Sequence, residues 1–367
     1  MRLAAYDNFD ELEQCQSAWD RLADRCVFRT WRWLATWWRH YGSEDPRCRL
    51  HVVVARDADE QVLGVLPCYV HASAISGRTL RLLGDGEVCS DHLGLLAATD
   101  NRGQVADAIA DALLSDPSWD ALDFAAVDDG EPSTGLLLDR LQQRGCHVDT
   151  RPEQSCWTID LPDSWDEFLA MQSKSHRKQL RRLDSRILQT DSAAWRHAAT
   201  AEDFSIGWDV LEDLHQRRRQ SLGEPGCFSW PRWRAFHEDI ARQLLAAGEL
   251  RLSWLELDGE PVAAEYHFAR GSTVFAYQGG LSPEAADAEP GRLSLIACIQ
   301  HAIGEGRRQF DLLRGDEPYK AHWRATPQAV HRVLAIPPRF APRVRYRART
   351  AIRNAGRWVQ QAARLFS

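Results

Sequence analysis

Ionisable side chains gather in the last third of this 367-residue chain, at the end of a predicted strand. The strand covers 309–313, and it runs into the sequence DLLRGDEPYK, which begins at Asp311 and ends at Lys320. Polar groups at a strand end lie where open sheets usually hold ligands. The apolar neighbours of Asp311 would suit a general base. A solvated surface turn with salt bridges fits the same residues.

A second candidate lies just upstream, where a loop rich in glycine, proline and acidic residues ends in the sequence PGRLS, from Pro290 to Ser294. A helix start exposes unpaired backbone N–H groups, and Gly291 lets a ligand approach the backbone closely. Arg292 would add a positive charge. The junction therefore predicts either a phosphate-binding site or an ordinary turn into a helix.

A third candidate is a basic helix within 165–188. His176 falls on its apolar stripe, which predicts a packed residue rather than a catalyst. The opposite side gathers four cations, which form either a solvated face or a docking surface for an anionic substrate. These are Lys174, Lys178, Arg181 and Arg182.

The elements that position these residues predict an α+β protein with two similar halves. Each half has a hairpin (50–69; 250–269), further strand, a helix and a strand with an Asp among apolar residues (122–124; 310–312). We interpret this as an internal duplication, with each half a mixed, largely antiparallel sheet flanked by helices. The predicted domains are 1–150 and 151–336, followed by a basic tail at 337–367.

Charge is distributed unevenly along the chain. The tail has eight arginines and no acidic residue, whereas the whole chain carries 45 basic and 52 acidic side chains. The acidic body argues against DNA binding. The tail fits a basic amphipathic helix on anionic lipid, a solvated extension, or a helix packed on the body.

The cysteine content favours a reducing compartment. There are nine cysteines and no C-x-x-C pair, and no apolar leader or membrane-spanning segment is evident. We therefore expect a cytoplasmic protein, with the tail as a route to a membrane surface, and no metal site.

Several segments together resemble the FemAB-like branch of the GNAT acyltransferases. More narrowly, they resemble the CelD-type proteins (with a BioF2-like acetyltransferase domain) associated with cellulose and exopolysaccharide production. The resemblance is carried by DGEPVAA from Asp258, Tyr277, the pair Gly279-Gly280, PGRL from Pro290, GEG from Gly304, FDLLRGDEPYK from Phe310, and Trp323.

The resemblance implies two tandem GNAT-like folds. It also implies acyl transfer from acetyl-CoA or another acyl-CoA to an amine or hydroxyl of a small or sugar-like acceptor. FemAB enzymes proper use aminoacyl-tRNA, which is the alternative donor, and a non-catalytic scaffold is a third possibility. The resemblance implies that Gly291, Arg292, Leu293 and Ser294 form the loop that binds the pyrophosphate of the donor. Only one glycine of the usual GNAT pattern is present there.

Direct transfer needs a base for the acceptor and an acid for the leaving group. Within the resemblance, the candidate bases are Asp311, Asp316 and Glu265. Tyr319 and Tyr277 are the candidate acids. Substrate binding would fall to Lys320, Arg314 and the basic helix residues Lys174, Lys178, Arg181 and Arg182.

Overall fold

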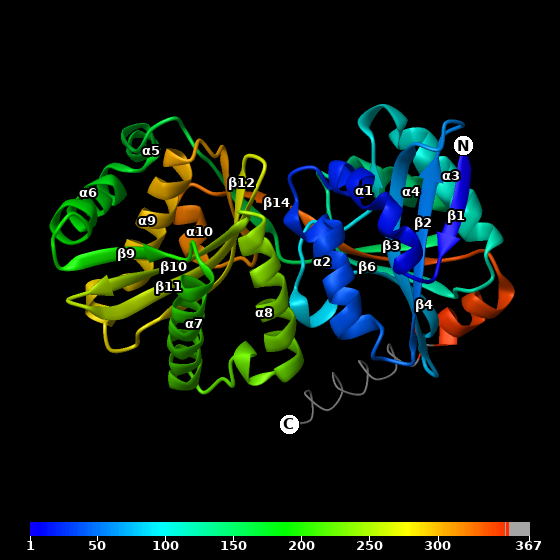
Figure 1. The fold of residues 1–367 in the computed structure, drawn as a ribbon. Helices are drawn as coiled ribbons and strands as arrows, with labels where there is room; N and C mark the ends of the chain where they lie inside the picture. The colour runs from blue at the N-terminus through cyan, green and yellow to red at the C-terminus, as the bar shows by residue number, and fades with distance from the viewer. Residues whose placement is uncertain (349, 352–367) are drawn as a thin grey trace, which may run out of the picture. The chain divides into compact units, whose positions relative to one another are not determined.

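The computed structural model describes residues 1–348 and 350–351 and contains two units, each built on a mixed β-sheet flanked by helices (Figure 1). The first unit comprises Met1–Leu22, Tyr41–Glu153 and the described residues from Val330 onward. The second comprises Ala23–His40 and Gln154–Ala329. The predicted α+β class is confirmed.

The sheet of the first unit has the strand order β1-β2-β3-β4-β6-β15-β7, with β5 paired to β3. Helices α3 and α4 pack against each other, and α3 also contacts β2 and β3. The elements are β1 (Arg2–Tyr6), α1 (Gln16–Ala23), β2 (Cys48–Arg56), β3 (Val62–Ser73), β4 (Gly77–Leu82), β5 (Leu96–Ala97), α3 (Arg102–Ser115), β6 (Ala121–Asp128), α4 (Pro132–Gln143), β7 (His147–Pro152) and β15 (Val330–Ile336).

The sheet of the second unit has the order β14-β8-β13-β12-β11-β10-β9. Its elements are α2 (Trp31–Trp37), β8 (Cys156–Asp160), α5 (Trp165–Met171), α6 (Lys174–Leu183), β9 (Ala193–His197), α7 (Ala201–Ser221), α8 (Pro231–Ala246), β10 (Leu250–Leu257), β11 (Glu260–Arg270), β12 (Thr273–Leu281), α9 (Pro290–Gly304), β13 (Gln309–Arg314), α10 (Pro318–His322) and β14 (Thr326–Gln328).

Strand alternation puts different helices on the two faces of this second sheet (Figure 1). Tyr266 of β11 packs against Trp208 of α7 and His237 of α8, with ring centroids 5.5 and 5.7 Å apart. Its neighbour Glu265 points the other way and meets Ser294 of α9. Successive side chains of a strand face opposite sides, so α9 covers the face that carries Glu265.

The two sheets share one plan. In each, a three-stranded antiparallel meander (β2-β3-β4; β10-β11-β12) is followed by a parallel partner (β6; β13). The next strand outward is antiparallel in both, but β15 fills that place in the first unit and β8 in the second.

The observed division differs from the predicted domains in two segments. Residues 330–336 form β15, which pairs with β6 and β7 and so belongs to the first sheet rather than the second. Residues 23–40 belong to the second unit, where Phe28 packs on Phe268 and Phe275. The predicted helix 165–188 is also interrupted, because Ser173 begins a new helix by accepting a hydrogen bond from the His176 amide.

The basic tail begins as a helix on the first unit. Residues 340–348 are helical, Arg343 donates to the Gly145 carbonyl at 2.8 Å, and the Tyr346 hydroxyl lies 3.2 Å from His147 Nε2. The remainder of the predicted amphipathic segment, residue 349 and 352–367, lies outside the described residues. Among the helices that are described, none is long and apolar enough to cross a bilayer.

The glycine pair of β12 is explained by close packing on both faces. A Cβ at Gly279 would lie 2.9 Å from Glu265 Oε2, and one at Gly280 would lie 2.6 Å from the backbone nitrogen of His215 in α7. The first neighbour is a side-chain end, whereas the second is helix backbone that cannot move independently.

We therefore expect Gly280→Ala to lower the free energy of unfolding by about 1–3 kcal/mol, because α7 must shift away from β12. Urea unfolding followed by circular dichroism measures the change. Gly304→Ala is the matched control, since no atom lies within 4 Å of its added Cβ. Equal urea midpoints for the two variants would show that α7 is not packed this tightly.

Candidate active site

A cavity of about 750 Å³ opens where β12 and β13 separate. The two strands pair in parallel only between 273–275 and 309–311. Beyond that point Tyr277 and Gly279 line one wall, and Leu312 and Arg314 line another. The volume is that of a small-molecule site, and its place at the carboxyl ends of parallel strands is typical of ligand sites in such sheets.

Both strands depart from regular pairing at the cavity. The register of β12 on β11 shifts between Tyr266 and His267, and four consecutive residues of β12 (276–279) line the cavity. In β13 the register shifts between Asp311 and Arg314, and Leu313 has φ 56°. Bulges of this kind re-aim side chains and end strand pairing near active sites.

Asp311 supports the bulge in β13. Its Oδ1 accepts a hydrogen bond of 2.8 Å from the Leu313 amide, and the side chain is buried outside the cavity lining. Asp316 is likewise outside the lining, where it accepts hydrogen bonds from the Ser155 amide and Trp157 Nε1 at 3.2 and 3.1 Å. These placements favour structural roles over the predicted role of general base.

Glu265 lines the cavity from β11. Its Oε1 accepts a hydrogen bond of 2.5 Å from the Ser294 hydroxyl, and its Oε2 lies 3.0 Å from His267 Nε2. A carboxylate oxygen can accept more than one hydrogen bond, so each oxygen retains acceptor capacity. Of the three predicted bases, Glu265 is the one in the cavity lining.

Both predicted acids line the cavity. Burial, with the Glu317 and Glu265 carboxylates, raises the pKa of Tyr319 to about 12, so this phenol keeps its proton at neutral pH although half of the residue is exposed. The Tyr277 hydroxyl lies 2.9 Å from Nε2 of His237, which is completely buried. Burial lowers the pKa of His237 well below its usual value, and its imidazole is therefore neutral.

The start of α9 contributes two of its four predicted ligand-binding residues to the cavity, Gly291 and Arg292. Leu293 is buried in the core instead, and the Ser294 hydroxyl is directed to Glu265. The amides of Arg292 and Leu293 already donate to the Glu289 carbonyl at 2.9 and 3.2 Å. The helix start thus offers the Gly291 backbone and the Arg292 guanidinium, which contacts the Glu289 carboxylate.

The basic helix α6 lies outside the cavity lining. Arg182 pairs with Glu289 at 3.1 Å, which connects it to the start of α9, while Lys174, Lys178 and Arg181 are exposed. His176 is a packed residue, as predicted, and it contacts His322 and Trp323. Burial lowers its pKa to about 4.

Lys320 is buried beneath the strand end. Its Nζ donates to the carbonyls of Leu313 and Gly315 at 3.0 Å each, and Glu317 Oε2 lies 3.0 Å away. Lys320 borders the cavity, but its ammonium is held by backbone acceptors. This favours a structural role over the predicted anion contact, while Arg314 stays at the cavity wall.

Four ionisable residues of the cavity lining were not among the predicted site residues: Arg219, His267, Glu317 and His322. His267 is two residues after Glu265, so strand alternation could have placed both on one face. Arg219 belongs to the arginine run at the end of α7, and its position beside the cavity depends on packing that no local pattern encodes.

Comparison with known proteins supports the class of this domain. Residues 174–321 match the family model described as an acetyltransferase (GNAT) domain. No curated protein matches the sequence. The family match covers α6 to α10, which include the whole start of α9 and the strands around the cavity. The prediction of an acyltransferase of the GNAT class is confirmed at this level.

Solved structures share the fold at low sequence identity. The crystal structure of FemX has a TM-score of 0.63 at 12% identity, covering 90% of this chain and 97% of that one. The C-terminal domain of a putative lysylphosphatidylglycerol synthetase from Agrobacterium fabrum has a TM-score of 0.54 at 12% identity, covering 94% and 96%. L-PGS from Bacillus licheniformis has a TM-score of 0.51 at 13% identity, covering 85% and 94%. The FemAB-like fold expected from the sequence is supported.

The structural role of Lys320 can be tested directly. We expect Lys320→Met to lower the free energy of unfolding by about 2–4 kcal/mol, because the buried carbonyls of Leu313 and Gly315 lose their donor. The exposed Lys178→Met should change it by less than about 0.5 kcal/mol. Urea unfolding measures both. A stable Lys320→Met protein with weakened ligand binding would instead restore the role of anion contact.

Proposed function

We propose that the second unit transfers an acyl group from an activated donor, a CoA thioester, to an amine or hydroxyl acceptor. The observation that carries the proposal is a single cavity lined by a carboxylate (Glu265), a protonated phenol (Tyr319) and a helix start with a cation (Gly291 and Arg292). These are the groups that direct acyl transfer requires.

In this mechanism Glu265 accepts a proton from the acceptor amine or hydroxyl as its nitrogen or oxygen attacks the thioester carbonyl. The new C–N or C–O bond forms and the C–S bond breaks. Tyr319 donates its proton to the leaving sulfur and regains one from the solvent, to which Glu265 releases the proton that it accepted. Ser294 and His267 hold Glu265 in position throughout.

An aminoacyl-tRNA donor is the second candidate. It is favoured by the exposed cations of α6 (Lys174, Lys178 and Arg181), which could contact a nucleic-acid backbone. The likeness to FemX and to a lysylphosphatidylglycerol synthetase, whose name denotes an aminoacylated lipid product, adds to this candidate. An aminoacyl ester would use the same cavity, with an oxygen in place of sulfur as the leaving atom.

The acceptor is proposed from the resemblance found in the sequence. A sugar-like or other small acceptor in exopolysaccharide or envelope synthesis would agree with the CelD-type pattern. Those reactions take place near membranes, where a basic tail at 337–367 would give peripheral contact. A non-catalytic scaffold is less favoured, because a scaffold does not need a carboxylate and a phenol that line the same cavity.

Donor identity is tested by calorimetry with acetyl-CoA, longer acyl-CoAs and aminoacylated tRNA. We expect the wild type to bind an acyl-CoA. Arg292→Ala should weaken this binding about tenfold, because a charge-assisted contact is lost, whereas Lys178→Ala should leave it unchanged. Salt-sensitive tRNA binding that Lys178→Ala weakens would select the second donor. Binding of neither class would overturn the proposed function.

The base is tested by Glu265→Gln, assayed as donor cleavage with a panel of amines and amino sugars. We expect kcat to fall about 10²–10⁴-fold with little change in thermal stability, because the amide keeps the size of the carboxylate but cannot accept the proton. Glu260→Gln is the matched control, since Glu260 is an exposed residue of the same strand. An undiminished kcat in Glu265→Gln would remove Glu265 from the mechanism.

A further inference from the structure

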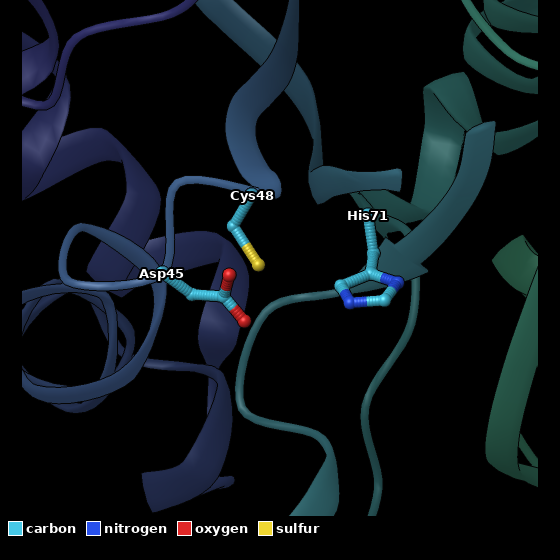
Figure 2. Close-up of side chains that lie close together, drawn as sticks. All are labelled: Asp45, Cys48 and His71. Carbon is cyan, nitrogen blue, oxygen red and sulfur yellow. The ribbon is translucent and has the colours of Figure 1, made fainter. Parts of the chain in front are cut away.

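The first unit contains a cluster of metal-ligating side chains that the proposed transfer reaction does not use. Asp45, Cys48 and His71 each offer one donor atom, and these atoms lie within 4.8 Å of one another. Figure 2 shows the carboxylate and the thiol side by side, with the imidazole across from them.

The backbone fixes this arrangement. Cys48 at the start of β2 is the direct cross-strand partner of His71 in β3, so the two side chains share one face of the sheet. Asp45 lies in the turn just before β2, where the Cys48 amide donates to the Asp45 carbonyl at 2.8 Å. The carboxylate is oriented by the Arg47 amide, which donates to Asp45 Oδ1 at 2.9 Å.

A thiol, an imidazole and a carboxylate are also the groups that enzymes with a cysteine nucleophile use, but the environment of Cys48 opposes that role. Burial and the adjacent Asp45 carboxylate raise the pKa of Cys48 to about 11, whereas a nucleophilic cysteine needs a lowered pKa. Burial, with Arg47 and Arg81, lowers the pKa of His71, so its imidazole is neutral and carries a free lone pair for a cation.

We propose that Asp45, Cys48 and His71 bind a zinc ion. Nitrogen, sulfur and oxygen donors of these three kinds are each common zinc ligands, and three protein ligands leave a fourth position for water. All three residues are partly exposed, which gives the ion a route of entry, and His71 also lines a cavity of about 360 Å³ on this face of the sheet.

Binding requires two exchanges at the cluster. The Cys48 thiol loses its proton to the solvent as the Zn–S bond forms. Arg47 must release the Asp45 carboxylate, which it now holds through Nη2 at 2.7 Å and Nε at 2.9 Å. The Arg47 side chain is 65% exposed, so it can turn into solvent. Arg81 and Asp85 are the further charges beside the cluster.

The sequence does not reveal this site, because its ligands are spaced three and twenty-three residues apart without a C-x-x-C pair. The strand register brings them together. The proposal departs from the expectation that the protein has no metal site.

The test is a competition titration of the untagged full-length protein, stripped of metal, with Zn²⁺ and a chromophoric chelator. We expect one equivalent to bind, and Cys48→Ser or His71→Ala to weaken binding more than about 100-fold, beyond the range of outer-shell changes. Cobalt substitution should give a thiolate-to-metal charge-transfer band that Cys48→Ser abolishes. Cys89→Ser, at an exposed cysteine of the same unit, should bind as the wild type does.

Arg47→Ala distinguishes this site from one elsewhere in the chain. Removing the competing guanidinium should tighten zinc binding about tenfold, an effect that a loss of folding cannot produce. Thermal unfolding of the metal-free variants checks that they fold. The proposal is overturned if the wild type binds no zinc, or if both His71→Ala and Arg47→Ala bind zinc as tightly as the wild type.

Discussion

The candidate active site depends on one interruption in the second sheet: β12 and β13 pair over three residues and then separate. Separation frees backbone groups that must find other partners, because unpaired buried polar groups are costly. Asp311 accepts from the Leu313 amide, and Lys320 donates to the carbonyls of Leu313 and Gly315. Charged residues that suggest catalysis in the sequence therefore bind backbone groups where the strands separate, and the cavity lies at this separation.

Side chains alternate along β11, so that ionisable residues face the cavity and an aromatic residue faces the layer behind it. Glu265 and His267 face α9 and the cavity, whereas Tyr266 faces the opposite layer of α7 and α8. Behind the cavity, Tyr277 is fixed by the buried His237 and packs near Phe28 from the segment 23–40. An aromatic layer of this kind limits movement, so a ligand would meet a wall whose geometry is set before binding.

Local sequence patterns predicted many of the individual elements, but they did not predict which strands distant in the sequence pair with each other. The hairpin 250–269 and the helix start at Pro290 have turn and helix-start residues suited to their backbone, and both were predicted from the sequence. The placement of β15 in the first sheet depends on pairing with β6, some two hundred residues earlier. The bulge at Leu313 has a positive φ without a glycine, so no local pattern indicated that Asp311 would support a bulge there.

The shared strand order raises the question of why transfer is assigned to the second unit. Two carboxylates of the first unit are held by guanidinium groups: Arg332 binds Asp123 through two hydrogen bonds of 2.7 Å, and Arg81 pairs with Asp85 at 2.7 Å. A carboxylate fixed in this way is a poor proton acceptor, because protonation would cost the ion pair. Glu265 is instead held by a hydroxyl and an imidazole, so it can accept a proton without losing a bidentate arginine. Asp123 and Asp85 thus differ from Glu265 in their partners, and that difference makes Glu265 the best proton acceptor of the three.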